Sequence, residues 1–266
     1  MASAHVGVIV GAAVVVMVAT PAYAFRARRI ADPVVRVNHL LDSRYRRVHV
    51  TSMAVLAGGV GANSFLPLYL RTVRGQSSSA AAFAVLFLTV GWSTSAWVSS
   101  RLQDRWPGEV VTLLGSGIAL PGVAFSALVV HVDAAIPVVY GAFFWLGAGV
   151  GMITSTGAAL LQSRTADSEM GRLNAAHQFL RTLSITFGIA VVGAITLAVV
   201  GARTGDVEVV RDALAGDDVT APPAVLRAIG DGYALSIALM TAVVAGAVVS
   251  AVRLVQTRDH PVVSAR

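Results

Sequence analysis

The stretch Ile136–Leu161 reads IPVVYGAFFWLGAGVGMITSTGAALL and contains no charged side chain. About 20 consecutive apolar residues are enough for an α-helix to cross the hydrocarbon core of a bilayer. The stretch exceeds that length, so it predicts a transmembrane helix. The rest of the chain repeats the same pattern on both sides of it.

Seven apolar runs of this kind follow one another, separated by short charged breaks. The runs are Val6–Ala24, Val48–Leu70, Ala80–Ser100, Val110–Val130, Ile136–Leu161, Ala175–Val200 and Tyr233–Leu254. None of them has an Asp, Glu or Lys well inside it. A soluble domain would have no means of hiding this much apolar surface, so the sequence predicts an all-α integral membrane protein with seven transmembrane helices.

The composition agrees with a membrane protein and excludes several kinds of chemistry. Apolar residues make up 56% of the chain and charged residues only 13%, which is well outside the balance of a soluble domain. Cysteine is absent, which rules out disulfides, thiol catalysis and thiolate metal sites. Lysine is absent too, so a retinal-type photoreceptor with a Schiff base is excluded. We expect no catalytic residues, metal, cofactor or nucleic-acid partner, and no enzyme activity.

The placement of arginine predicts which way the helices run. Short cytoplasmic loops carry an excess of positive charge. The linker after the first run is the most basic part of the chain, with Arg26, Arg28, Arg29, Arg36, Arg44, Arg46 and Arg47. A cytoplasmic linker puts the N-terminus outside the cell membrane and the C-terminus in the cytoplasm. The net acidic stretch 201–230 then lies outside, and only Arg71 and Arg74 go against the trend.

The lengths of the connecting loops divide the chain into three parts. Residues 1–47 form a peripheral transmembrane helix and a basic cytoplasmic linker. Residues 48–256 form a six-helix bundle with an outer loop at 201–230, and residues 257–266 form a cytoplasmic tail. Pro21–Ala24 resembles a signal-peptidase site, but no arginine precedes the first run. A retained helix with its N-terminus outside is therefore favoured, and cleavage is the alternative.

Four stretches of the chain carry a resemblance to one family, and the first two are FLPLYLRTVRGQS at 65–77 and GAGVGM at 147–152. They resemble the LPLYLQ-x-V-x-G-x-S stretch and the G-x-G-x-G helix of the fourteen-span drug/proton antiporter branch of the major facilitator superfamily. RLQDR at 101–105 resembles its cytoplasmic G-x-x-x-D-R-x-G-R loop, although Ser100 and Pro107 stand at the glycine positions. EMGRLNA at 169–175, with the following Arg181 and the FGIA at 187–190, resembles its penultimate span.

The resemblance covers nearly the whole chain but only the second half of such a transporter, spans eight to fourteen. It implies one peripheral helix plus a six-helix bundle like the carboxy-terminal half of that family. The implied function is proton-coupled efflux of hydrophobic, cationic small molecules by alternating access. The implied partners are the lipid bilayer, the substrate, and a missing amino-terminal half or a second copy. In this family the main proton-coupling carboxylates lie in that missing half.

The resemblance also implies two groups of site residues. Asp104, between Arg101 and Arg105, would accept hydrogen bonds from arginine and cap a helix, and so latch the inner gate in one state. A substrate cavity of apolar and aromatic residues would draw on the second, third and fifth runs. The candidates there are Asn63, Phe65, Tyr69, Trp92 and Trp145, and Trp97 and Phe144 are further candidates.

Three polar side chains lie inside the sixth run and are functional candidates because ionisable groups in a membrane are costly. Arg181 either extends to the interface or is buried with a partner, and no carboxylate lies within any run. His177 and Gln178 lie one turn earlier. His177 is either an interface residue or a proton relay.

Two other readings of the chain stay open. In one, the chain is a truncated remnant or fragment with no independent activity. In the other, it is a rhomboid-type intramembrane serine protease with Ser116 as nucleophile and His177 as base. Leu114 stands where the protease motif has glycine, which argues against the second reading.

Overall fold

The computed structural model describes residues 42–61, 63–132, 134–205 and 222–257. These ranges are mostly helical, with short turns between the helices, and contain no strand. The helices are α3 (Ser43–Val55), a π-helix η1 (Leu56–Gly61), α4 (Leu66–Thr72), α5 (Ser78–Gln103), α6 (Gly108–His131), α7 (Ile136–Ser163), α8 (Asp167–Thr204) and α10 (Pro223–Gln256). The predicted first span Val6–Ala24, most of the basic linker and nearly all of the tail lie outside the described residues.

Six helical segments in the described ranges are long and apolar enough to cross a membrane. They are Tyr45–Thr72, Ser78–Gln103, Gly108–Val129, Ile136–Ser163, Asp167–Thr204 and Pro223–Gln256. They correspond to the second to seventh predicted runs, so the prediction of an all-α membrane bundle is confirmed.

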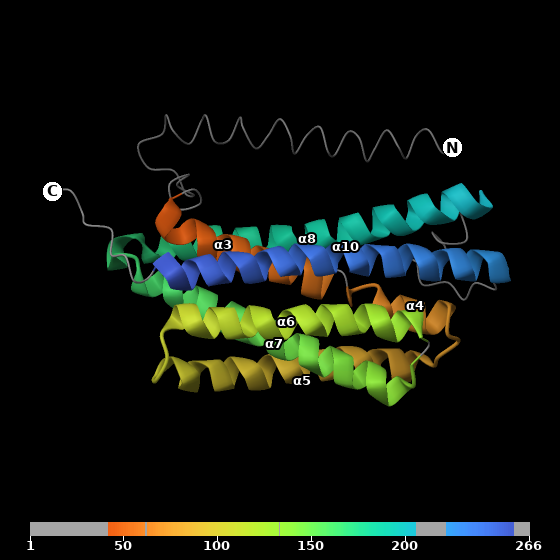
Figure 1. The fold of residues 1–266 in the computed structure, drawn as a ribbon, viewed down its shortest axis with the longest axis horizontal. Coiled ribbons are helices and arrows are strands. Elements are labelled where there is room, and N and C mark those ends of the chain that lie inside the picture. The colour runs from red at the N-terminus through yellow and green to blue at the C-terminus, as the bar shows by residue number, and fades with distance from the viewer. Residues whose placement is uncertain (1–41, 62, 133, 206–221, 258–266) are drawn as a thin grey trace.

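The helices lie side by side along one common direction (Figure 1). α7 packs between α5 and α6, and α10 packs against α6, α8 and α3. η1 contacts α8, so the first segment links the two sides of the bundle. The main core contains the large buried side chains Phe143, Leu146 and Ile153 of α7 with Tyr233 and Ile237 of α10.

The second predicted run is not the uninterrupted helix that its hydropathy indicates. It changes to a π-helix at Leu56–Gly61, and α4 begins only at Leu66. This change falls where glycines bring backbones together, because a Cβ on Gly58 would meet the carbonyl of Met240 at 2.9 Å and one on Gly61 would meet the Cα of Gly188 at 2.8 Å. Side-chain periodicity carries no signal for such a change in helix type.

α8 and α10 both extend into the stretch 201–230 that the sequence predicts as an outer loop. α8 ends at Thr204, where Gly205 adopts φ 71, and such a left-handed glycine is a common helix stop. α10 begins at Pro223, which occupies the favoured first-turn position for proline. The 38 residues of α8 span about 57 Å, so this helix is longer than the hydrocarbon core is thick.

Most of the described arginines gather at one end of the bundle, which we call the basic end. There α3 begins, α5 and α7 end, α8 begins and α10 ends (Figure 1). The arginines at or near these helix ends are Arg46, Arg47, Arg101, Arg105, Arg164, Arg172 and Arg253. The opposite end has Arg71, Arg74, Arg203 and Arg227. The basic end is the end that the arginine rule assigns to the cytoplasm.

Candidate functional site

A polar cavity of about 270 Å³ lies between α7 and α8 towards the basic end. Its lining residues are Thr154, Ala158 and Gln162 of α7, and Asn174, His177, Gln178 and Arg181 of α8. We call this the α7–α8 cavity. The α7 residues are spaced by four and the α8 residues by three or four, so each set forms one face of its helix. That polar stripe on α8 is a sequence signal that could have added Asn174 to the predicted site.

Two buried histidines face each other beside the cavity. Nδ1 of His177 on α8 lies 3.3 Å from Nδ1 of His49 on α3, and the ring centroids are 5.4 Å apart. At this distance one imidazole donates a hydrogen bond and the other accepts it, so the two rings share one proton at their facing nitrogens. A second proton would place two N–H groups against each other. This contact joins α3 to α8.

Further polar side chains lie on the helices that carry the histidine pair and on α7. Arg181 lies about one turn after His177 on α8 and lines the same cavity. The hydroxyls of Thr51 and Ser52 on α3 and of Thr156 on α7 are buried and form no hydrogen bond. Buried hydroxyls in a membrane helix are normally paired, so this polar interior is unusual for a purely structural core.

Among the described residues, the partner of Arg181 is an aromatic ring rather than a carboxylate. Its guanidinium lies over the Trp92 ring of α5, with 5.3 Å between Cζ and the ring centroid. Trp92 Nε1 donates a hydrogen bond to Thr154 Oγ1 at 3.1 Å. These contacts bring Trp92, Thr154 and Arg181 from three helices to one place. Cation–π contact of this kind stabilises a charge that is partly removed from water.

The structure places the other predicted cavity residues away from the α7–α8 cavity. Asn63 is buried just after η1, and its Nδ2 donates to the Gly59 carbonyl at 2.9 Å. Phe65 lies next to Gly193 of α8. Tyr69 stacks on Tyr233 in the core, with 5.5 Å between ring centroids. Trp145 is 50% exposed on the outer surface of α7, and Trp97 and Phe144 are exposed too.

The predicted latch residues lie exposed, with Arg101 in the last turn of α5 and Asp104 and Arg105 in the turn that follows. In the described part of the chain Asp104, Arg101 and Arg105 form no ion pair with one another, and Arg101 lies over the Trp97 ring at 5.0 Å. Asp104 does not cap α6, because Pro107 is the N-cap residue and no side chain bonds there. The latch role stays a prediction that requires a partner outside these residues.

An ion pair that the sequence analysis missed joins two helices near this turn. Arg164, at the end of α7, donates to Glu109 in the first turn of α6 at 2.6 Å. Both side chains are largely buried. Glu109 follows Pro107 by two residues, and Arg164 lies at the end of another helix. Neither position carries a local sequence signal for this pairing, because the pairing depends on the tertiary fold.

The arrangement that a serine protease needs is not formed. Ser116 Oγ donates to the Leu113 carbonyl of its own helix at 2.9 Å. His177 faces His49 instead. The two residues of the proposed nucleophile–base pair therefore have other partners.

A bundle of membrane-length helices with a polar cavity occurs in membrane transport proteins and in other membrane proteins. The family model of the Major Facilitator Superfamily matches residues 2–189, and the chain belongs to this superfamily. It is a multi-pass membrane protein, and its family is one of transporters rather than of enzymes.

Two curated relatives support the same assignment. They are the uncharacterized MFS-type transporters Rv1877 and MT1926 of Mycobacterium tuberculosis, from strains H37Rv and CDC 1551. Each is 27% identical to this chain over 158 residues, which are 59% of this chain and 23% of the relative. The matched stretch thus covers about a quarter of the length of these relatives.

Proposed function

We propose that this chain forms one wall of the translocation pathway of a proton-coupled transporter that exports hydrophobic small molecules by alternating access. The observation that carries the proposal is the α7–α8 cavity, where a histidine pair and an arginine lie within a bundle of membrane-length helices. Ionisable groups at such positions mark substrate or proton pathways. The opposite wall comes from another helical bundle, either further polypeptide, a separate chain or a second copy.

The charge of the cavity narrows the substrate class. Arg181 is the one charged residue among the described side chains that line it, and no carboxylate lines it. The Trp92 ring and Ala158 add apolar surface beside that charge. A positive wall favours neutral or anionic hydrophobic molecules over cations. On this wall we therefore propose an anionic or neutral substrate, in place of the cationic one that the family resemblance implies.

The histidine pair is our candidate for the proton-carrying group. Histidine can relay a proton because its ring nitrogens both accept and release one. One proton between His49 and His177 holds α3 against α8, whereas a second proton weakens that contact. Proton binding would thus be coupled to the packing of two helices, which alternating access requires.

The experiment is transport by the complex purified through this chain and reconstituted in proteoliposomes with an imposed pH gradient. We would follow the flux of a lipophilic weak-acid dye in the wild type, His49→Gln and His177→Gln. Ser126→Ala is the matched control, because Ser126 is equally buried but bonds only to the Gly122 carbonyl of its own helix. Both histidine variants should lose the gradient-driven part of the flux, and the control should keep it.

Other outcomes separate the alternatives. Full gradient-driven flux in both histidine variants would place the proton site elsewhere. Preference for a lipophilic cation over the weak acid would refute the proposed substrate class. A chain that purifies alone, without a partner bundle or a second copy, and shows no flux would support the reading as a fragment with no independent activity.

A further inference from the structure

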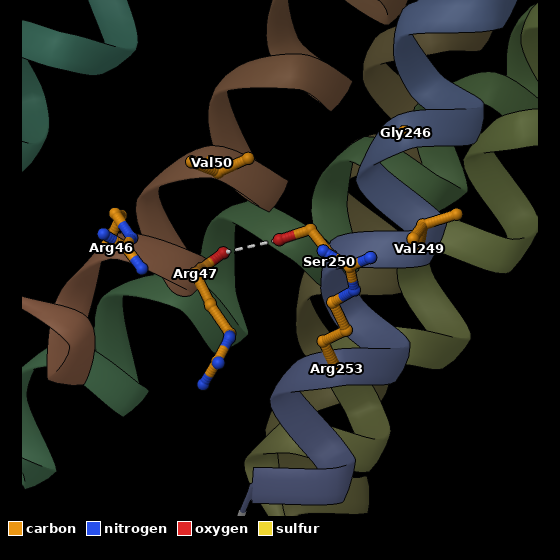
Figure 2. Close-up of a pocket in the computed structure, with 7 residues that line it drawn as sticks. All are labelled: Arg46, Arg47, Val50, Gly246, Val249, Ser250 and Arg253. Atoms are coloured by element: carbon orange, nitrogen blue, oxygen red, sulfur yellow. Dashed lines mark hydrogen bonds between the residues drawn. The ribbon is translucent and has the colours of Figure 1, made fainter.

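A second pocket, of about 320 Å³, opens between α3 and α10 at the basic end. Figure 2 shows its lining residues, which are Arg46, Arg47 and Val50 of α3 with Gly246, Val249, Ser250 and Arg253 of α10. Ser250 Oγ donates to the Arg47 carbonyl at 3.4 Å and joins the two helices there. This α3–α10 pocket shares no lining residue with the α7–α8 cavity, so it is a separate site.

The α3–α10 pocket concentrates positive charge. Arg46, Arg47 and Arg253 come from two helices, and none of them forms an ion pair with a carboxylate of the described residues. Arg47 Nη1 donates to Thr257 Oγ1 at 3.0 Å, which holds that guanidinium beside the pocket. Arginine forks of this kind bind phosphate oxygens through charge-assisted hydrogen bonds. The positive charge of the three arginines complements the negative charge of a phosphate group.

The pocket continues into apolar surface towards the middle of the bundle. Val50 lies about one turn along α3 from Arg46, and Val249 lies one turn before Arg253 on α10. These two valines are 48% and 52% exposed. In a chain that spans the membrane, exposed apolar side chains at this depth face acyl chains. Basic residues above an apolar groove fit a lipid with a charged head group better than a soluble anion.

We propose that the α3–α10 pocket binds an anionic phospholipid of the phosphatidylglycerol class. The head-group phosphate lies among the three arginines and accepts hydrogen bonds from their guanidinium groups. An acyl chain runs along Val50, Gly246 and Val249. The bound lipid stabilises the contact between α3 and α10, and this role is independent of what the protein transports.

The test is native mass spectrometry of the full chain released from nanodiscs that contain equal amounts of phosphatidylglycerol and phosphatidylcholine. The wild type should retain phosphatidylglycerol in preference to phosphatidylcholine. Arg47→Gln and Arg253→Gln should each lower that retention about fivefold, as expected for loss of one juxtamembrane charge. Arg105→Gln removes an equal charge from an exposed turn at the same end and should change retention little.

A third variant tests the apolar part without changing the charge. Gly246→Leu adds a side chain into the groove, and a Cβ at this position meets no atom within 4 Å, so the fold should tolerate it. Retention should fall in this variant too. Because Gly246→Leu leaves the three arginines unchanged, it still tests lipid binding if an arginine variant fails to fold.

Three results would overturn the proposal. In the first, Gly246→Leu and the pocket arginine variants retain as much phosphatidylglycerol as the wild type. In the second, the wild type retains the two lipids equally. In the third, millimolar inorganic phosphate displaces the bound lipid, which would make the pocket a site for free anions.

Discussion

Glycine decides how closely the helices of this bundle approach. A Cβ at Gly91 of α5 would overlap the Phe144 carbonyl of α7, and a Cβ at Gly147 or Gly151 of α7 would overlap carbonyls of α5. Glycines on both helices therefore allow the backbones of α5 and α7 to come into direct contact. In lipid, where apolar surface gives helices no reason to associate, such close contact is a main source of stability.

Gly147→Ala should therefore destabilise the protein. The added methyl group would overlap the Leu88 carbonyl oxygen, which is backbone and cannot rotate away. Overpacking of this kind costs about 1–3 kcal/mol. Thermal unfolding of the detergent-solubilised chain measures the effect.

Gly141→Ala is the control on the same helix, because a Cβ there meets nothing within 4 Å. Its melting temperature should match or slightly exceed that of the wild type, since alanine favours helix over glycine. Equal melting temperatures for Gly147→Ala and the wild type would show that α5 and α7 do not pack as described.

Only some residues of the site could be predicted from the sequence. His177, Gln178 and Arg181 stood out because polar side chains are rare in a membrane span, and Trp92 was named through the family resemblance. His49 was missed because its partner lies 128 residues away, and only the fold reveals that contact. For the aromatic candidates, the structure adds that Tyr69 stacks on Tyr233 and that Trp145 is half exposed. Hydropathy alone does not distinguish a core face or an outer face from a cavity wall.

At the scale of the element, the apolar runs predicted where helices exist but not where they begin and end. α8 starts eight residues before its predicted run, because Asp167 and Glu169 suit the positive end of a helix. The π-helix at Leu56–Gly61 was not predicted either. Helix ends and changes of helix type depend on contacts with neighbours and with the interface, which a hydropathy window does not contain.

The Glu109–Arg164 ion pair fixes the start of α6 to the end of α7. Glu109→Gln should lower the free energy of unfolding by about 1–3 kcal/mol, because Arg164 loses a charge-assisted hydrogen bond in a largely buried place. Urea titration in detergent, followed by tryptophan fluorescence, measures this change.

Asp231→Asn offers a matched comparison. Asp231 pairs with Arg203 between α10 and α8, but both side chains are more than half exposed. Exposed pairs contribute about 0–1 kcal/mol, so this variant should stay close to the wild type. If the two variants lost equal stability, the pair at Glu109 would be no more than a surface contact.

At the scale of the whole molecule, the described helices supply a bundle of the Major Facilitator Superfamily with a polar cavity near one end. The family resemblance already predicted that bundle from a few motifs. The structure adds the α7–α8 cavity to that prediction. The central claim is that this cavity belongs to a water-filled pathway rather than to a dry core. The absence of cysteine makes this claim testable by single-cysteine labelling without background.

The most direct measurement is labelling of Gln178→Cys with a membrane-impermeant maleimide in sealed membrane vesicles of both orientations. Phe179→Cys is the control at nearly the same depth, because Phe179 is 59% exposed but does not line the cavity. The account predicts labelling of Gln178→Cys and protection of Phe179→Cys in the acyl chains. Protection of Gln178→Cys in both orientations, or equal labelling of the two positions, would contradict a pathway through the α7–α8 cavity.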